Sequence, residues 1–574
     1  MTAPRSSGTV DPVELSQRWL RQDFPPTDQQ AAVIGAPAGP MLVVAGAGAG
    51  KTETMAARVV WLVANGMVLP EQVLGLTFTR KAARELGVRI RARLQSLASS
   101  GLVEAMPAIT PTVSTYDSYA GDIVREYGLL LPTEPTGRLI TDTERWMIAR
   151  DVVMERHPGF TTRRSVPTII DDMLELSDGM DNHLATPDEV IAECRATAAE
   201  IDGLPDRDGK TLKGVDSTLE RIGDALVYRR ELLDVVADYR ARLAERNLMT
   251  FGAQMSKAAQ TVAAHPEVGD AQRRRFRVVM LDEYQDTGHA QRVLLRSLFG
   301  GGVDPGLTAV GDPMQSIYGF RGATAANLAH FRTDFPTGTG GDATPAAQRE
   351  LTTSWRNPAR VLDLANTVSR WSLDATGTGS AAVSPLVSRP GAGTGDVKAA
   401  WFDTREEELV WLADELAARY HHRDATREFS AAVLLRKNAE ATPIHDLLVE
   451  RGVPVEMSDG PGLLEVPEVA DVYATLRVLV DPSDDIALLR LLTGVRWNIG
   501  AADLQALARR VDQLTLRDRG TGGGSGEDAG GGAGEDTDEP TGLTALVTPQ
   551  SGDSPATATV RRRLADLDRD SSRV

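Results

Sequence analysis

A glycine-rich loop near the start of the chain has the residue types that bind phosphate. The sequence AGAGAGKT, residues 45–52, follows the apolar run 41–44 and precedes an amphipathic helical stretch. Its glycines let backbone N–H groups turn toward an anion, Lys51 can reach the outer phosphates of a nucleotide, and Thr52 can ligate Mg²⁺. An ordinary strand-to-helix turn is the alternative, because Ala45 stands where the strict pattern has glycine. The loop residues expected at the nucleotide are Ala45, Gly46, Ala47, Gly48, Ala49, Gly50, Lys51 and Thr52.

Two adjacent acids follow a second apolar run, in RVVMLDEYQDT at residues 277–287. At the carboxyl end of a strand, Asp282 can hold Mg²⁺ through water, and Glu283 can polarise the water that attacks a γ-phosphate. A solvated turn is the alternative for an isolated pair of acids. The glycine-rich loop upstream favours the hydrolytic role, because both groups would then serve one phosphate site.

A third motif, AVGDPMQSIYGFRGA at residues 309–323, joins polar groups to aromatic rings. Asp312 and Gln315 follow another apolar run, and Tyr318, Phe320 and Arg321 occupy the next turn. This order suits a nucleotide sensor joined to a surface that stacks on bases. Because aromatic side chains are usually buried, we expect one of the two rings to belong to the core instead.

A fourth stretch, TRKAARELGVRIRARL at residues 79–94, carries six basic residues against the single acid Glu85. Such a strip can follow a phosphate backbone even on an acidic protein. Arg80 and Lys81 come directly after a strand-like run and are the better placed. For the later arginines, a solvated helix face with ionic partners elsewhere is an equal alternative. The six are Arg80, Lys81, Arg84, Arg89, Arg91 and Arg93.

Length and composition limit the class of protein. With 574 residues, 42% of them hydrophobic, the chain can form several domains with more than one core. The apolar runs are too short to span a membrane and the N-terminus lacks an apolar segment of the signal type, so we expect a cytoplasmic protein. Its one cysteine, Cys194, excludes an intrachain disulfide. The net charge of −18 argues against a protein that coats nucleic acid non-specifically. A local basic groove on an acidic protein can still bind a phosphate backbone.

The order of apolar and amphipathic stretches predicts the elements that must position these motifs. Strand-like and helical stretches alternate over 21–124 and again over 245–338, which is typical of a parallel α/β sheet. Residues 125–244 read as a helical insertion, 339–458 as a second α/β unit and 459–574 as mainly helical. We expect 1–20 to be disordered and the acidic glycine-rich segment 520–540 to be a flexible insertion, with an acidic regulatory tail as the alternative.

Taken in this order, the motifs resemble superfamily 1 DNA helicases of the UvrD, PcrA and Rep type, and among them the actinobacterial UvrD-like and AdnB-like proteins. The signatures are AGAGAGKT, TFTRKAA, LDEYQDT, GDPMQSIYGFRGA and SWRNP, and the match runs from about Phe24 to Leu507. The resemblance implies an α/β fold with two P-loop RecA-like domains, ATP and Mg²⁺ between them, and an α-helical subdomain inserted in each. It also implies a motor that moves 3′ to 5′ along single-stranded DNA and acts at junctions with duplex.

Further site residues are implied by the resemblance alone. Gln30 in TDQQAAVI corresponds to a glutamine that recognises adenine, and Gln315 to a γ-phosphate sensor. In TTSWRNPAR, Trp355 corresponds to an aromatic stacked on adenine and Arg356 to an arginine that contacts the γ-phosphate. The alternatives are a surface glutamine and a buried tryptophan beside a surface arginine. The residues implied at DNA are Phe78, Arg80, Lys81, Tyr318, Phe320, Arg321, Arg436 and Asn438.

The sequence departs from the family pattern in three places. Asp117 stands at the histidine of the usual TFH motif, and Glu53, expected beside the adenine, stands where UvrD and PcrA have an arginine. Neither an HxxKGLEF-like motif nor a VALTRA-like motif, which carries a catalytic arginine, is present. We therefore expect a C-terminally incomplete second RecA-like domain and weak or absent unwinding by this polypeptide alone.

Three functional hypotheses follow. The first is an ATP-dependent 3′–5′ DNA helicase that serves repair or recombination, and the second is a non-catalytic DNA-binding or partner subunit of a helicase–nuclease complex. The third is a P-loop ATPase unrelated to DNA, which the aromatic residues after GDPMQ disfavour. The catalytic set expected under the first hypothesis consists of Lys51, Asp282, Glu283, Gln315 and Arg356, and its completeness favours that hypothesis.

Overall fold

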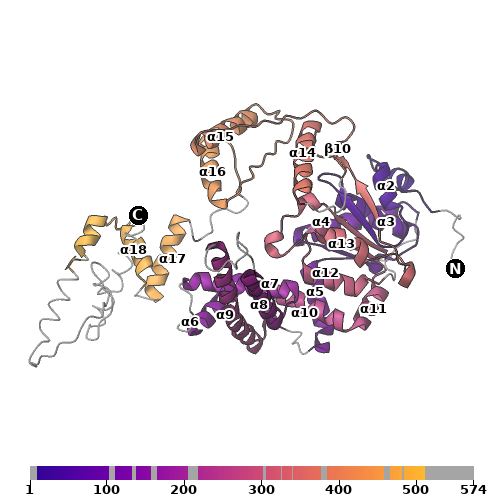
Figure 1. Ribbon diagram of the computed structural model, residues 1–574. Helices are drawn as coiled ribbons and strands as arrows, with labels where there is room; N and C mark the ends of the chain where they lie inside the picture. The colour runs from indigo at the N-terminus through magenta and orange to yellow at the C-terminus, as the bar shows by residue number, and fades with distance from the viewer. Residues whose placement is uncertain are drawn as a thin grey trace, which may run out of the picture. The chain divides into compact units, whose positions relative to one another are not determined.

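The computed structural model describes residues 9–102, 110–131, 137–156, 164–203, 217–301, 306–324, 326–338, 340–376, 384–457, 464, 466–480, 484–507 and 509–510. The chain divides into two compact units, Met1–Lys398 and Ala399–Val574 (Figure 1). The acidic segment 520–540 lies outside the described residues. Within the described part of the chain, no helix is both long and apolar enough to cross a membrane.

The first unit is built on a six-stranded sheet with the order β3-β2-β6-β7-β1-β8. Every neighbouring pair in it is parallel. This confirms the predicted α/β class with a parallel P-loop sheet. The strands are β1 (Met41–Ala45), β2 (Val73–Thr77), β3 (Thr112–Thr115), β6 (Val278–Leu281), β7 (Gly306–Gly311) and β8 (Ala347–Leu351).

The sheet is buried on both faces, and alternate residues of its strands enter two different cores. Leu42 and Val44 of β1 pack into one cluster, whereas Met41 and Val43 pack into the other, as the two-residue period of a strand requires. The first face is covered by α5 (Tyr116–Tyr127), α10 (Phe251–Ala264), α11 (Pro266–Arg275), α12 (His289–Phe299) and α13 (Ala326–Asp334). The second is covered by α2 (Asp28–Ile34), α3 (Lys51–Ala64) and α4 (Arg80–Ser99).

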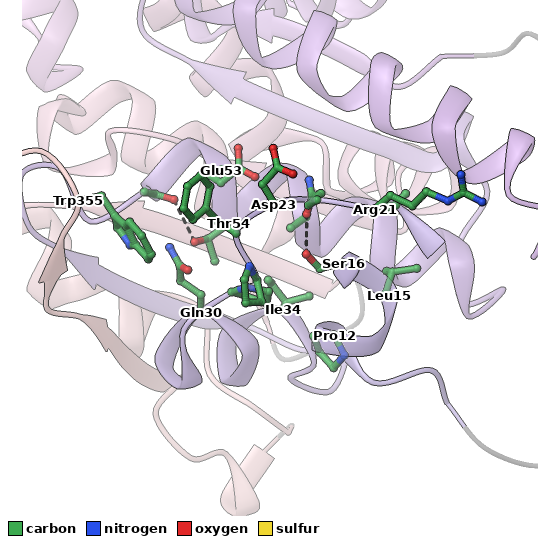
Figure 2. Close-up of a pocket in the computed structure, with 17 residues that line it drawn as sticks. Pro12, Leu15, Ser16, Arg21, Asp23, Gln30, Ile34, Glu53, Thr54 and Trp355 are labelled. Atoms are coloured by element: carbon green, nitrogen blue, oxygen red, sulfur yellow. Dashed lines mark hydrogen bonds between the residues drawn. The ribbon is translucent and has the colours of Figure 1, made fainter. Parts of the chain in front are cut away.

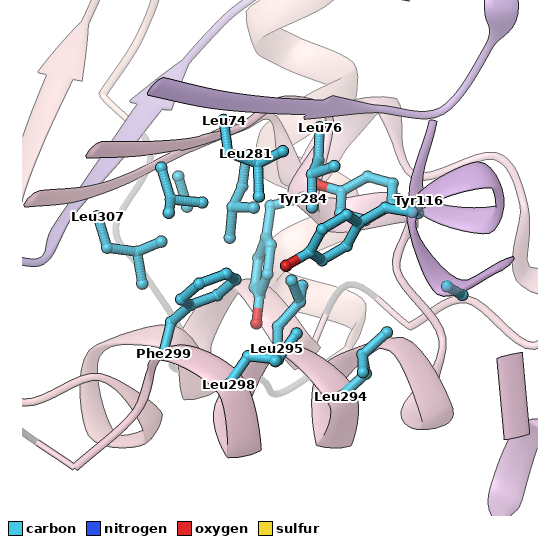
Figure 3. Close-up of a cluster of buried hydrophobic side chains, with 14 of the residues drawn as sticks. Leu74, Leu76, Tyr116, Leu281, Tyr284, Leu294, Leu295, Leu298, Phe299 and Leu307 are labelled. Carbon is cyan, nitrogen blue, oxygen red and sulfur yellow. The ribbon is translucent and has the colours of Figure 1, made fainter. Parts of the chain in front are cut away.

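Figure 3 shows the first of these cores between the sheet and α12. The helix residues Leu294, Leu295 and Leu298 point toward the strands, and the ring of Tyr284 stands between the two layers. Tyr284 is fully buried and directly follows the two candidate catalytic acids, which come after β6. The packing of this ring therefore anchors the loop that carries those acids.

The expectation of a disordered N-terminus up to residue 20 is wrong for residues 10–20. This segment forms α1 (Pro12–Glu14) and the π-helical turn η1 (Leu15–Trp19). Leu15 is buried in the core of the second face, and the Trp61 indole N–H of α3 donates to the Val10 carbonyl at 2.7 Å. The short polar sequence is ordered because α3 offers it an apolar surface and hydrogen-bond partners.

A separate group of helices lies between α5 and α10 in the chain. It comprises α6 (Asp142–Arg156), α7 (Val166–His183), α8 (Pro187–Gly203) and α9 (Ser217–Glu245), the range we read as a helical insertion. Ile169, Ile170 and Tyr239 belong to a core of its own. The paired strands β4 (Arg138–Leu139) and β5 (Leu248–Met249) lie near the start and the end of the insertion. Cys194 is a buried free thiol in α8.

The sequence 339–458, expected as part of a second RecA-like domain, begins in the first sheet. Its strand β8 pairs with β1, because an edge strand can use the free hydrogen-bonding side of the nucleotide-loop strand. The chain continues through β9 (Thr353–Ser354), α14 (Ala359–Thr376) and β10 (Val387–Ser388), which pairs with β9.

The described residues of the second unit form helices and no strand. Its helices include α15 (Arg405–His421), α16 (Ala441–Glu450), α17 (Pro467–Val480) and α18 (Asp485–Thr493). Ala413, Ile444 and Leu448 form a small core between α15 and α16. The apolar segment 431–435 belongs to no helix or strand there, so the described residues of this unit do not form the sheet expected of a second α/β unit.

Candidate functional site

The motifs singled out from the sequence meet at one edge of the sheet. The glycine-rich loop follows β1, Phe78 follows β2, Asp282 follows β6 and Asp312 follows β7. Parallel strands bring their carboxyl ends together, and open α/β sheets bind ligands at that edge. The Asp282 N–H donates to the Leu76 carbonyl of β2 at 2.8 Å, which closes the gap between the two strand ends.

The loop between β1 and α3 has the geometry of a phosphate cradle. Gly48 and Gly50 have φ of 76° and 79°, a region that side chains with a Cβ rarely adopt. A Cβ on Gly48 would lie 2.7 Å from Ser354 Oγ, so the space is filled on that side as well. Because α3 begins at Lys51, its first N–H groups and its positive dipole end face the loop.

The residues after β8 are bonded directly to this loop. The Trp355 N–H donates to the Gly48 carbonyl at 2.9 Å, and the Ser354 hydroxyl donates to the Ala47 carbonyl at 3.0 Å. The Arg356 side chain is exposed beside Gly48, whose added Cβ would lie 2.8 Å from Arg356 Cβ. The structure therefore brings Trp355 and Arg356, which follow β9, to the loop.

Lys51 and Glu283 form an ion pair at the centre of the edge. Lys51 Nζ lies 2.9 Å from Glu283 Oε2, and the lysine side chain is only 12% exposed. Glu283 has φ of 49°, in the left-handed region, which is costly for a residue with a Cβ. This backbone conformation directs the carboxylate toward the lysine, and strain of this kind is typical of functional sites.

Asp282 is buried beside this pair. Burial, and after it the charge of Glu283, raises the pKa of Asp282 to about 6, and the charge of Lys51 opposes this shift. The hydroxyl of Tyr116, a fully buried ring of α5, donates to the Asp282 carbonyl at 3.0 Å. A buried carboxylate with an elevated pKa gains from a nearby cation, so the residue suits a metal ligand.

Gln285 connects the acid pair to the strand end of β7, and the sequence alone did not single it out. Its Nε2 donates to Glu283 Oε2 at 2.9 Å, and its Oε1 accepts from the Asp312 N–H at 3.0 Å. Its own carbonyl accepts from the Ser316 hydroxyl at 3.3 Å. Asp312 in turn accepts from Gln315 Nε2 at 2.6 Å. The buried amide of Gln285 thus joins the two polar motifs. In the sequence, its place two residues after Glu283 is the one signal that could have suggested this role.

The residues present fit a nucleotide triphosphate and Mg²⁺. The loop has glycines at the positive φ values that such a turn needs, and Lys51 lies directly after the loop, at the start of α3. Thr52 in the first turn of α3 and the buried Asp282 supply oxygen ligands, the kind that Mg²⁺ prefers.

A pocket of about 570 Å³ opens next to the loop, on the side of α2 and the N-terminal segment (Figure 2). Gln30 and Trp355 line it, together with Glu53 and Thr54 of α3. Gln30 is buried, and its amide is engaged at both ends. Its Oε1 accepts from the Thr27 N–H at 3.0 Å, and its Nε2 donates to the Ala49 carbonyl at 3.2 Å. One N–H and one lone pair of this amide remain for a ligand.

Buried Arg58 of α3 holds α2, and with it Gln30, against the loop helix. Arg58 is 1% exposed, and within the described part of the chain its guanidinium bonds to carbonyl and hydroxyl oxygens and to no carboxylate. Burial, followed by the charge of Arg349, lowers its pKa to about 10. Its acceptors, at 2.8–3.1 Å, are the carbonyls of Val33, Ile34, Ala36 and Pro37 and the Thr308 hydroxyl. The carbonyls at the C-terminal end of α2 carry the negative end of its dipole, which suits a cation.

Glu53 faces the basic helix α4. It is ion-paired with Arg93 and lies 3.8 Å from Arg89. These two arginines of α4 have their ionic partner in the loop helix. The alternative of partners elsewhere therefore holds for Arg89 and Arg93.

The remaining arginines of α4 line an open groove of about 400 Å³. Arg80, Arg84 and Arg91 face it from α4, and Ser114 and Ser118 face it from β3 and α5. Positive charge and hydroxyl groups are the usual partners of phosphate oxygens. Lys81 is exposed beside them at the start of the helix.

The aromatic residues form a stepped surface beside the acid pair. The rings of Phe78 and Tyr318 are stacked, with centroids 5.6 Å apart and planes 7° apart. Phe320 is 81% exposed, whereas Tyr318 is half-buried, so Tyr318 is the partly packed member of the pair. The Arg321 guanidinium lies 5.5 Å from the Tyr318 ring centroid and 5.7 Å from that of Phe320.

Asp117, which replaces the histidine of the family motif, lies near this surface. Burial raises its pKa, and the charge of Arg321 and a hydrogen bond from Gln291 oppose the shift. A carboxylate here repels phosphate and attracts the arginine. Arg436 and Asn438, the other residues implied at DNA, belong to the second unit, where both are exposed.

Comparison with known proteins agrees with this geometry. Residues 26–336 match the family model described as the UvrD/REP helicase N-terminal domain. Residues 350–518 match the model described as the UvrD-like helicase C-terminal domain. The first match contains the cradle, the acid pair and the aromatic surface.

Three curated relatives are similar over most of this chain. The ATP-dependent DNA helicase UvrD1 of Mycobacterium tuberculosis is 29% identical over 483 residues, which cover 82% of this chain and 54% of the relative. PcrA of Bacillus subtilis is 26% identical over 476 residues, 82% of this chain and 55% of the relative. Rep of Escherichia coli is 26% identical over 469 residues, 82% of this chain and 60% of the relative.

The chain thus spans little more than half the length of these relatives. The N-terminal model nevertheless covers more than half of the 574 residues, and the C-terminal model covers a further part. Two adjoining models of one family therefore cover most of the chain and reach into both units, and the chain belongs to the UvrD-like family of superfamily 1 DNA helicases.

Proposed function

We propose that this chain binds Mg-ATP at the carboxyl edge of the first sheet and hydrolyses it to move 3′ to 5′ along single-stranded DNA. Its relatives are named ATP-dependent DNA helicases. The direction of movement is the one implied by the resemblance of its motifs. The DNA substrates proposed are single strands and their junctions with duplex, met in cytoplasmic repair or recombination.

The observation that carries the proposal is the hydrogen-bonded path from the acid pair to the aromatic surface. Gln285 bonds to the Glu283 carboxylate on one side and to the Asp312 N–H on the other. The Asp312 turn then leads through Gln315 into the segment that ends at Tyr318. A group that responds to a γ-phosphate is therefore bonded, through one amide, to the loop that presents rings to DNA.

At the phosphate end, each residue has a separate task. Mg-ATP, when bound, supplies the phosphoanhydride bond that is cleaved. Lys51 neutralises charge on the outer phosphates, and Thr52 and Asp282 hold the ion. Glu283 orients the attacking water and accepts its proton. Gln315 and Arg356 contact the γ-phosphate, where the guanidinium offsets the developing charge.

At the DNA end, stacking provides a contact that does not depend on base identity. Phe320 exposes most of its ring, and Tyr318 stacks on Phe78 beside it. Such platforms hold successive bases of a single strand. Arg80, Lys81 and Arg321 supply positive charge next to these rings, which suits the strand's phosphates.

The test is steady-state ATP hydrolysis by the full chain with and without single-stranded oligodeoxythymidine. We expect the strand to raise the rate, and we expect Lys51→Ala to abolish hydrolysis. The direction of movement is read from displacement of streptavidin placed at either end of a biotinylated strand. Hydrolysis indifferent to the strand would contradict the proposal. Strand binding without any hydrolysis would support the partner-subunit alternative instead.

A further inference from the structure

We propose that Phe24 forms the second face of the base-binding pocket, so that the adenine of ATP is held between Phe24 and Trp355. The inference rests on the proposed ATP site and adds the group that completes its base end. It assigns a binding role to a residue upstream of α2 that none of the motifs includes.

The two rings border the same pocket and meet edge to face. Both line it, their centroids are 6.2 Å apart and their planes meet at 65°. Two rings that contact opposite faces of one base lie about 7 Å apart, twice the carbon contact distance of ~3.5 Å. A rotation of the Phe24 ring toward parallel and a shift of under about an ångström would therefore admit a purine between them.

The exposure of the rings agrees with a ligand between them. Phe24 is 75% exposed and Trp355 is 36% exposed, although both border a pocket. A flat base inserted between them would bury both faces. Trp355 is kept in place by its N–H bond to the Gly48 carbonyl of the cradle, so the base end and the phosphate end of the site are joined through the backbone.

The chain around Phe24 is held at both ends. On the N-terminal side, Leu15 is buried, and the Gln22 N–H donates to the Ser16 carbonyl at 3.0 Å. On the C-terminal side, Thr27 caps α2 by accepting from the Gln30 N–H at 3.2 Å. Two prolines lie between, at residues 25 and 26, and restrict the backbone further. Phe24 is therefore presented by a stiff segment.

The lining of the pocket leaves Phe24 as the group best suited to this face. Glu53, at the position where a cation could stack on a base, is a carboxylate and is ion-paired with Arg93. In Figure 2, Glu53 and Asp23 lie next to each other with their carboxylates directed the same way. Their negative charge disfavours the triphosphate at that end, which leaves the phosphates to Lys51. Gln30 then offers its remaining N–H and lone pair to an edge of the base.

The experiment measures equilibrium binding of Mg-ATP and of Mg-tripolyphosphate, which lacks the base, to the full chain by calorimetry. Phe24→Ala is expected to weaken ATP binding about three- to tenfold, the effect of one aromatic contact. Its affinity for tripolyphosphate is expected to equal that of the wild type. Phe24→Tyr is expected to restore ATP binding, and Leu129→Ala, a change at another exposed apolar side chain of the first unit, to leave both affinities unchanged.

Three outcomes overturn the inference. Equal ATP affinity of Phe24→Ala and wild type would show that the ring does not contact the base. Equal losses of ATP and tripolyphosphate binding in Phe24→Ala would show a general effect on the cradle. Wild-type protein that binds neither ligand would contradict the proposed ATP site itself, and this result is distinct from the other two.

Discussion

The phosphate end and the base end of the nucleotide pocket are built in opposite ways. At the phosphate end, charged groups stand at the ends of buried strands, and the Lys51–Glu283 pair and Asp282 are largely withdrawn from water. At the base end, exposed rings and an N-terminal segment border an open pocket. Under the proposed function, the first end is assigned the chemistry and the second the affinity for the base.

This difference predicts different consequences of mutation. A group that acts on the transferred phosphate affects the transition state, so its loss lowers kcat. A ring that stacks on the base contacts the ground state and the transition state alike, so its loss raises KM.

Glu283→Gln is expected to give the largest loss. The amide keeps the size of the side chain but cannot accept the water's proton, so kcat for ATP hydrolysis should fall about 10²–10⁴-fold. Equilibrium binding of Mg-ATP should persist. Glu71→Gln, at an exposed glutamate of the first unit, is the matched control. A Glu283→Gln enzyme with wild-type kcat would remove the residue from the mechanism.

Asp282→Asn separates stability from activity. In the folded protein the pKa of Asp282 is raised to about 6 from the ordinary aspartate value of 3.8. As pH rises between these two values, Asp282 ionises in the unfolded chain but stays protonated in the folded protein. The free energy of unfolding therefore falls over this range, and the loss is complete above about pH 6. The asparagine removes that loss. The nucleotide-free variant should therefore melt higher than wild type at pH 8, by on the order of a few degrees.

The same variant provides its own control through pH. At pH 5 the gain in Tm should shrink to about half, because the wild-type carboxyl is then mostly protonated in the folded state. Mg²⁺-dependent hydrolysis should be lost at both pH values. A variant that is no more stable than wild type at pH 8 would contradict the assigned burial cost.

Trp355→Ala tests the base end. Loss of one stacking face should raise KM for ATP about tenfold while kcat stays within about twofold of wild type. Trp371→Ala, at an exposed tryptophan of α14, is the control and should leave both parameters unchanged. A fall in kcat with unchanged KM would contradict the assignment of Trp355 to base binding.

The smallest effects are expected along α4. This helix carries the ionic partners of Glu53 and also the arginines that line the open groove. Arg84→Ala and Arg91→Ala, in the groove, should each weaken single-strand binding a few-fold and reduce the slope of log affinity against log salt by about 0.7. Arg89→Ala removes only a partner of Glu53 and should leave the slope unchanged. Equal slopes for all three variants would show that the groove does not follow the strand.

The phosphate end could be predicted from the sequence because its determinants are local. An apolar run followed by glycines, lysine and threonine, or by two acids, specifies a strand end and its chemistry within about ten residues. The parallel sheet followed from the alternation of such runs with helices, and the structure confirms it.

The base end could not be predicted in the same way, because its determinants are distant in sequence. The order of residues 10–20 depends on contacts between Leu15 and α3, and Phe24 faces a tryptophan more than three hundred positions away. The pairing of β8 with β1 likewise depends on the free edge of a strand formed much earlier in the chain. Gln285 went unnoticed because an amide is informative only once both of its partners are known.

We propose that the acid pair and the aromatic surface are coupled through Gln285. This coupling is tested most directly by the rate of ATP hydrolysis with and without single-stranded DNA in Gln285→Ala and in wild type. We predict that the strand raises the rate of the wild type and that Gln285→Ala keeps basal hydrolysis measurable but loses most of this stimulation. Equal stimulation of the two proteins would contradict the account.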